Sequence, residues 1–265
     1  MHRVREGFAA SRITRALFLT ASCLSGATSV HALTTFTPGT PAKADEVNAN
    51  FTELADRITG LEAKHTSTTL NVDCASNPSA LQSAVAEASE FSTLLISGTC
   101  DGPVRVFRQG LTLQAVNAGF DGIVGSGVFA SGMQVLTINA GSVTVSGLKI
   151  TATEPIGSTG VSVFNGGSAT FDNLHVTGAE QSVTVARAGA ARFENTTNID
   201  LINVVDGAVA RIEGGNGGFR IAVRRNGSVE LRDTANGSQF TGIEVQDDAM
   251  FRSRGGAAIT VNGPI

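Results

Sequence analysis

Three charged residues in the second half of the chain, Arg192, Arg211 and Glu230, stand at equal intervals of 19 positions. A guanidinium group binds a carboxylate through two parallel hydrogen bonds, so stacked arginines are suited to binding an acidic sugar. The competing interpretation is a solvated sheet face whose charges keep the protein soluble, because exposed ion pairs contribute little energy. Either interpretation requires a fold that brings these three positions side by side.

The other candidates for chemistry are isolated in the sequence. Asp172, Asp247 and Asp248 carry oxygens suited to calcium, but no loop has regular ligand spacing, so no metal site is predicted. His175 has no neighbouring nucleophile, and we expect it to point outward at the surface. The chain has no Trp and no Tyr, and its 14 Phe residues are expected in the core. The sequence therefore predicts no catalytic residue and no cofactor.

The elements that must position these residues are short repeated strands. Blocks that start at Val163, Val185, Val204 and Val223 each pass through a glycine-containing turn to an apolar residue eight positions on. These apolar positions, with one further repeat, are Phe171, Phe193, Ile212, Leu231 and Phe251. A period near 20 residues, built of alternating strands, predicts an all-β solenoid whose coils share one core and contain three strands each.

Two columns of outward-facing side chains follow from this period. The first column contains one carboxylate among small residues, which cannot supply both the acid and the base of glycoside hydrolysis. Its predicted members are Ser162, Thr184, Asn203, Ala222, Glu244 and Thr260. The second column, which contains the charged residues above, is predicted to be Thr144, Thr170, Arg192, Arg211, Glu230 and Met250.

The bend after the second strand of each coil has its own signature. Glycine, asparagine and aspartate tolerate left-handed backbone angles, and one of them stands at each corresponding position. These positions are Gly147, Asn173, Asn195, Gly214 and Asp233.

Residues 66–103 are predicted to cap the amino-terminal end of the solenoid, and residues 104–265 to form its coils. Within the cap, Asn77, Pro78 and Ser79 open a helix with an apolar face. Cys74 and Cys100 are expected to form a disulfide, because an even pair in an exported chain is normally bonded. A helix held in this way hides the open end of the core.

Residues 43–65 are predicted to form an amphipathic helix. Its apolar residues recur at alternating steps of three and four, which is the spacing of a coiled-coil seam. The seam is Ala44, Val47, Phe51, Leu54, Ile58 and Leu61. It is shorter than three heptads, so a single helix that packs on the solenoid end is the alternative.

The first 32 residues are predicted to be a secretory signal peptide. Four arginines precede an apolar stretch and a run of small residues that ends at Ala32, and residues 33–42 follow as a linker. Acylation of Cys23, as in a lipoprotein, is a second possibility. Removal of the signal leaves 15 Lys and Arg against 22 Asp and Glu, which does not favour binding to nucleic acid or to anionic membranes.

Two resemblances extend these predictions. The coil length, the cap, and the motifs VSGLKI at Val145–Ile150 and FDNLHV at Phe171–Val176 resemble right-handed parallel β-helix proteins of the pectin-lyase-like type. The segment PAKADEVNANFTELADRITGLEAK resembles short helical stalks of exported bacterial proteins and phage-type fibres, which implies self-association as a trimer through Val47, Phe51, Leu54, Ile58 and Leu61.

The likeness to pectin-lyase-like proteins is one of architecture, and architecture does not carry function. The sequence favours a secreted, non-catalytic β-helix with a structural or adhesive role at the cell surface or outside the cell. The alternative that the resemblance implies is a polysaccharide lyase or glycoside hydrolase, with catalytic groups gathered from coils that are not equivalent.

Overall fold

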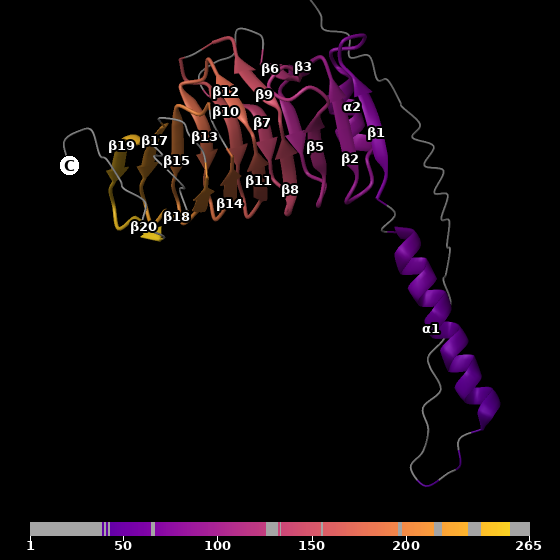
Figure 1. Ribbon diagram of the computed structural model, residues 1–265. Coiled ribbons are helices and arrows are strands. Elements are labelled where there is room, and N and C mark those ends of the chain that lie inside the picture. Colours follow the sequence, from indigo (N-terminus) through magenta and orange to yellow (C-terminus); the bar gives the residue numbers. More distant parts are fainter. Residues whose placement is uncertain are drawn as a thin grey trace, which may run out of the picture. The chain divides into compact units, whose positions relative to one another are not determined.

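The computed structural model describes residues 39, 41, 43–64, 67–125, 132, 134–154, 156–195, 198–214, 219–232 and 240–254. The predicted signal peptide, Cys23, most of the predicted linker, Thr260 and Asp233 lie outside these residues. From residue 67 onward the described chain forms a parallel β-solenoid, whose strands stack side by side from β1 to β20 (Figure 1). The prediction of a parallel β-helix is confirmed.

Sheet A is the longest of the three sheets. Among the described residues its nine parallel strands follow the order β1 (Thr69–Asp73), β2 (Thr93–Ser97), β5 (Thr112–Ala115), β8 (Val143–Ser146), β11 (Ser168–Asp172), β14 (Ala190–Glu194), β16 (Val209–Glu213), β18 (Ser228–Arg232) and β20 (Met250–Arg254).

Sheets B and C complete the coils. Sheet B consists of β3 (Thr99–Gly102), β6 (Gly122–Gly125), β9 (Lys149–Ala152) and β12 (His175–Thr177). Sheet C consists of β4 (Val104–Val106), β7 (Gln134–Ile138), β10 (Thr159–Val163), β13 (Gln181–Val185), β15 (Leu201–Val204), β17 (Phe219–Val223) and β19 (Phe240–Val245). From β2 to β13 each coil runs from sheet A through sheet B to sheet C.

The prediction of three strands per coil holds only as far as β12. After β12, sheet B continues as a single bridge between His175 and Asn198, and the later described coils contain one strand in sheet A and one in sheet C. Six residues connect β14 with β15 and five connect β16 with β17, against eight between β11 and β13, so these coils are shorter in sequence. Arg192, Arg211 and Glu230 therefore pair at intervals of 19 residues.

The core lies between the sheets and is made of alternate strand residues. Phe171 in β11 and Phe193 in β14 are fully buried and stacked, with their ring centroids 5.2 Å apart. The predicted bend is also present, since Gly147, Asn173, Asn195 and Gly214 all have positive φ angles. Because the inward residues of the strands from β2 to β18 form the apolar core, the side chains available for binding there are those that point outward.

The amino-terminal cap has the predicted composition. Helix α2 (Ala80–Glu87) follows Asn77, Pro78 and Ser79 and buries Leu81 and Val85. Cys74 and Cys100 form the predicted disulfide, with their Cα atoms 4.9 Å apart. Both cysteines are buried in the same core cluster as the first coils, so the disulfide fastens the cap to the solenoid.

Helix α1 (Ala44–Lys64) confirms that the predicted helix exists. Phe51, Leu54 and Ile58 of the predicted seam are exposed, and Phe51 is 65% accessible. Val47 is half-buried, and the side chain of Leu61 lies outside the described part of the chain. Self-association through this seam stays a prediction. No described helix is long and apolar enough to span a membrane.

Candidate functional site

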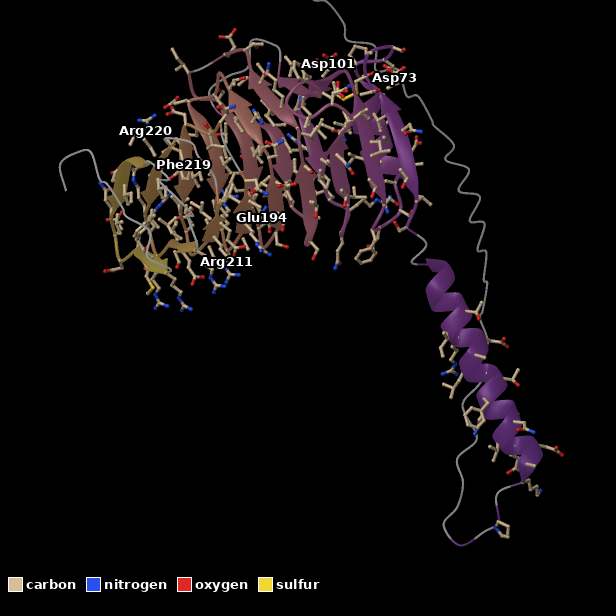
Figure 2. All side chains as sticks on the ribbon, in the orientation of Figure 1. Asp73, Asp101, Glu194, Arg211, Phe219 and Arg220 are labelled. Atoms are coloured by element: carbon tan, nitrogen blue, oxygen red, sulfur yellow. A yellow bond between two sulfur atoms is a disulfide. The ribbon has the colours of Figure 1, made fainter. Side chains whose placement is uncertain are left out.

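The predicted row of charged residues lies on the outer face of sheet A. Arg192 in β14 pairs in register with Arg211 in β16, which pairs with Glu230 in β18. Arg211 projects outward from the lower side of the solenoid in Figure 2, near Glu194. The prediction that these three side chains stack on neighbouring strands is confirmed, whereas their role in binding stays a prediction.

The last member of this column differs from the prediction. Arg252 lies beside Glu230, and Met250 lies beside Ser228, so the prediction of Met250 in the column is wrong. Phe251 correspondingly pairs with Val229 and does not continue the row of Leu231. The coil is two residues longer than the period suggests, and a shift of two residues leaves the alternation of inward and outward positions unchanged.

Carboxylates hold the arginines of this face in place. Arg192 forms ion pairs with Glu194, at 2.8 Å, and with Glu213. Arg211 lies 3.8 Å from Glu213 and 3.3 Å from Glu230. Each of these guanidinium groups therefore has its orientation set by two carboxylates.

Glu230 is the centre of the carboxyl-terminal part of this network. Its carboxylate lies 3.1 Å from Arg232 and 2.9 Å from Arg254, in addition to its contact with Arg211. Three guanidinium groups thus contact one carboxylate, whose side chain is only 17% accessible, and Arg252 lies beside Glu230 in the strand register. Positive charge is therefore in excess at this end of the face.

A shallow groove of about 430 Å³ runs over sheet A and includes all three predicted binding residues. It crosses five strands, from Thr144 in β8 to Glu230 in β18. Its lining residues are Ser142, Thr144, Ser168, Ala169, Thr170, Ala190, Ala191, Arg192, Val209, Arg211 and Glu230. Hydroxyl groups thus line one end of the groove, and guanidinium groups line the other.

The network around Glu230 predicts a specific pH dependence of stability. The hydrogen bond from Arg232, and the charges of Arg232, Arg254 and Arg211, lower the pKa of Glu230 below its ordinary 4.5. Because the folded pKa is lowered, the stabilisation is present above about pH 4.5 and is lost as the pH falls through the folded pKa. We expect the wild type to be more stable than Glu230→Gln at pH 7, with the difference shrinking below pH ~4.5.

Denaturant unfolding between pH 3 and pH 7 measures this difference. Asp248→Asn is the matched control, because Asp248 is exposed in a turn with a positive φ angle, which asparagine tolerates. A gap between wild type and Glu230→Gln that stays constant over this pH range would show that the arginines do not stabilise the ionised carboxylate.

The other predicted column lies on the outer face of sheet C. The register Ser162, Thr184, Asn203, Ala222 and Glu244 is as predicted. Although these residues stand on outward positions, Ser162, Thr184 and Ala222 are buried. Gln134 and Gln181 accept hydrogen bonds from Thr137, at 3.0 Å, and from Thr184, at 2.7 Å, so long side chains fold over the short ones.

A second groove, of about 420 Å³, lies on the carboxyl-terminal half of sheet C. Its lining residues are Gln181, Leu201, Asn203, Arg220, Ile221, Ala222, Arg224, Gly242, Ile243 and Glu244. Arg220 and Arg211 lie on opposite sides of the solenoid in Figure 2, so the two grooves are separate. This groove is missed by sequence reasoning because it is defined by small residues, Ala222 and Gly242, between longer ones.

His175 has a structural environment. It is half-buried, its Nε2 atom lies 3.1 Å from the Oδ1 atom of Asn173, and its Nδ1 atom lies 2.9 Å from the Nδ2 atom of Asn198. An amide nitrogen only donates, so Nδ1 is the acceptor in its contact with Asn198, and Nε2 faces the amide oxygen of Asn173. His175 joins neighbouring coils at the point where sheet B ends.

The aspartates considered for calcium do not come together. Asp172 accepts hydrogen bonds from Ser146, at 3.3 Å, and from Asn195, at 3.1 Å. Asp247 and Asp248 occupy a turn with positive φ angles. Among the described residues no group of three or more His, Cys, Asp or Glu side chains is arranged to hold a metal ion.

The prediction that the phenylalanines belong to the core is wrong for several of them. Phe107 and Phe120 of the solenoid are exposed, and Phe120 is 81% accessible. Both stand in turns between strands, where the alternation that marks inward positions does not operate.

Comparison of the chain with protein-family models, with curated proteins and with solved structures found no match. The functional argument therefore depends on the two grooves and on the groups that line them.

Proposed function

We propose that this protein is an exported, non-catalytic β-helix module with an adhesive role, and that it holds an extended acidic polysaccharide along the outer face of sheet A. The observation that carries this proposal is the groove over five strands, in which hydroxyl groups from Thr144 and Thr170 lead to the guanidinium groups of Arg192 and Arg211. A polymer with both hydroxyl and carboxylate groups matches this lining.

The ion pairs on this face favour binding over hydrolysis. Arg192 and Arg211 are oriented by glutamates, which reduces the side-chain entropy lost when a ligand carboxylate arrives. Glu230 has a lowered pKa, so its carboxylate is ionised near neutral pH and has no proton to donate as a general acid. Glycoside hydrolysis instead requires one carboxylic acid with a raised pKa.

The cap and helix α1 support the remaining parts of the proposal. The Cys74–Cys100 disulfide suits the oxidising compartment that a signal peptide over residues 1–32 implies. The exposed seam of Phe51, Leu54 and Ile58 suits association of three copies as a coiled coil. Several copies would bind one polymer together, so that sites that are weak individually give tight binding through avidity.

Binding of polygalacturonate to the protein without residues 1–32 tests the proposal, with isothermal titration calorimetry as the measurement. We expect Arg192→Ala combined with Arg211→Ala to weaken binding by about tenfold to about a hundredfold. Arg220→Ala, on the other side of the solenoid, is the matched control and should bind like the wild type. Equal binding by all three proteins would overturn the assignment of this groove.

Two further measurements distinguish the rival functions. Incubation with polygalacturonate, with and without calcium, should yield no shortened or unsaturated product, and such product would favour the lyase or hydrolase alternative. Light scattering should give the mass of three chains for the wild type and of one chain for Phe51→Asp. A monomeric wild type would remove the multivalent part of the proposal and leave the groove itself in place.

A further inference from the structure

We propose that the groove on the outside of sheet C is a second binding site, and that it takes an uncharged, hydroxyl-rich ring such as a neutral sugar. The site lies on β13, β15, β17 and β19 and shares no residue with the groove on sheet A. It does not depend on the function proposed for that groove.

The groove on sheet C exists because two small residues stand on outward positions of neighbouring strands. Ala222 lies between Asn203 and Glu244, and Gly242 lies at the end of the row that begins with Leu201 and Arg220. Longer side chains on both sides leave a space of about 420 Å³, which is within the usual range of small-ligand sites. A methyl group on Gly242 would meet only the Cγ atom of Arg220, at 3.9 Å, so the space is free and not a packing requirement of the backbone.

The floor of the groove is apolar and its rim is polar. Leu201 and Ala222, which stand on outward positions, contribute hydrocarbon to the lining, whereas Ile221 and Ile243 belong to the inward row. The Oε1 atom of Gln181 accepts hydrogen bonds from Thr184, at 2.7 Å, and from Asn203, at 3.3 Å. This fixes the amide of Gln181 and leaves its NH₂ group as a donor. A sugar ring, with an apolar face and hydroxyl groups around its edge, has the complementary arrangement.

The charges at the rim cancel, which distinguishes this groove from the one on sheet A. Arg220 forms an ion pair with Asp200 at 2.9 Å. The Nη2 atom of Arg224 donates to both carboxylate oxygens of Glu244, each at 2.8 Å. The paired groups still offer donors and acceptors, but they supply no net field to attract an anion. An uncharged ligand is therefore favoured.

Two residues of the lining retain unused hydrogen-bonding capacity. The Oδ1 atom of Asn203 and the Nε atom of Arg224 are buried and have no partner among the described residues. A buried polar atom without a partner is unfavourable, and a hydroxyl group both donates and accepts. Because both atoms lie beneath the rim, a ligand gains these bonds only by shifting the side chains above them.

Titration of neutral oligosaccharides, namely cellopentaose, maltopentaose and chitopentaose, at millimolar concentration tests this proposal. The chain without residues 1–32 is used, with calorimetry as the measurement. We expect at least one of the three to bind, and Gly242→Leu, which fills the groove, to weaken that binding by about tenfold or more. Arg220→Ala should also weaken it, while binding of polygalacturonate stays unchanged in both variants.

Ala190→Leu provides the matched control, because Ala190 is exposed and lines the sheet A groove. This variant should bind the neutral oligosaccharide like the wild type. The proposal is overturned if no oligosaccharide binds to the wild type, or if Gly242→Leu binds as well as the wild type does. Since polygalacturonate and the neutral sugars are measured separately, failure of one site is distinguishable from failure of the other.

Discussion

Replacement of Phe193 by alanine is expected to lower the free energy of unfolding by about 3–5 kcal/mol. Phe193 is fully buried in β14, and its ring stacks on that of Phe171, with the centroids 5.2 Å apart. The substitution removes this contact and opens a cavity in the middle of the core, where β11 and β16 on either side restrict relaxation. Denaturant unfolding followed by circular dichroism measures the loss.

The position of Phe193 also predicts how the variant unfolds. In a solenoid each coil contacts only its neighbours, so a defect at β14 weakens the connection between the coils before it and the coils after it. We expect the single transition of the wild type to broaden or to split in two. Val209→Ala is the matched control, because Val209 is exposed on the adjacent strand and should change stability by less than ~0.5 kcal/mol. Equal losses for both variants would contradict this account of the core.

Removal of the disulfide is the second large effect, with an expected loss of about 3.5 kcal/mol in the chain-entropy model. Cys74 and Cys100 are 26 positions apart, and the bond closes a loop that contains helix α2. The double variant Cys74→Ala and Cys100→Ala is suitable because both positions are buried, so alanine adds no polar group. Thermal unfolding of wild type and variant under the same conditions gives the difference.

Hydrogen exchange locates this effect. Without the disulfide, amides of β1 and α2 should exchange faster than those of β11 and β14, because the cap opens before the central coils. Wild type treated with a reducing agent provides a second test, and it should match the double variant. Faster exchange spread evenly over all coils would show that the disulfide does not act on the cap.

The coils and their outward columns could be predicted because two regularities coincide in this chain. Alternation marks inward and outward positions, and the equal length of the coils around Arg192, Arg211 and Glu230 places these residues on neighbouring strands. The disulfide and helix α2 could be predicted for a different reason, because each has a local sequence signal.

Features that depend on loop length or on side-chain conformation could not be predicted. The coil that ends at β20 is two residues longer than the spacing that placed Met250 after Glu230, and alternation cannot detect an even shift, so Arg252 was not expected beside Glu230. Burial of Ser162 and Thr184 depends on neighbouring side chains that fold over the column. Alternation predicts only whether a residue points inward or outward, and gives no information on what covers it.

The sheet C groove escaped prediction for a related reason. Ala222 and Gly242 carry no chemical signal of their own, and a hollow exists only because Arg220, Arg224 and Gln181 are longer. A search of the sequence for reactive side chains does not detect small residues. A site made by the absence of side-chain volume is visible only after the register of four strands is known.

The equal length of the two coils between β14 and β18 has a consequence for how such a chain changes in evolution. Arg192, Arg211 and Glu230 are separated by one complete unit of 19 residues, with one strand in sheet A and one in sheet C. Tandem duplication of one unit would insert a rung into both sheets and leave the pairing of every later strand intact. The groove on sheet A would lengthen in steps of about 4.8 Å, so its reach along a polymer can be adjusted by gene duplication alone.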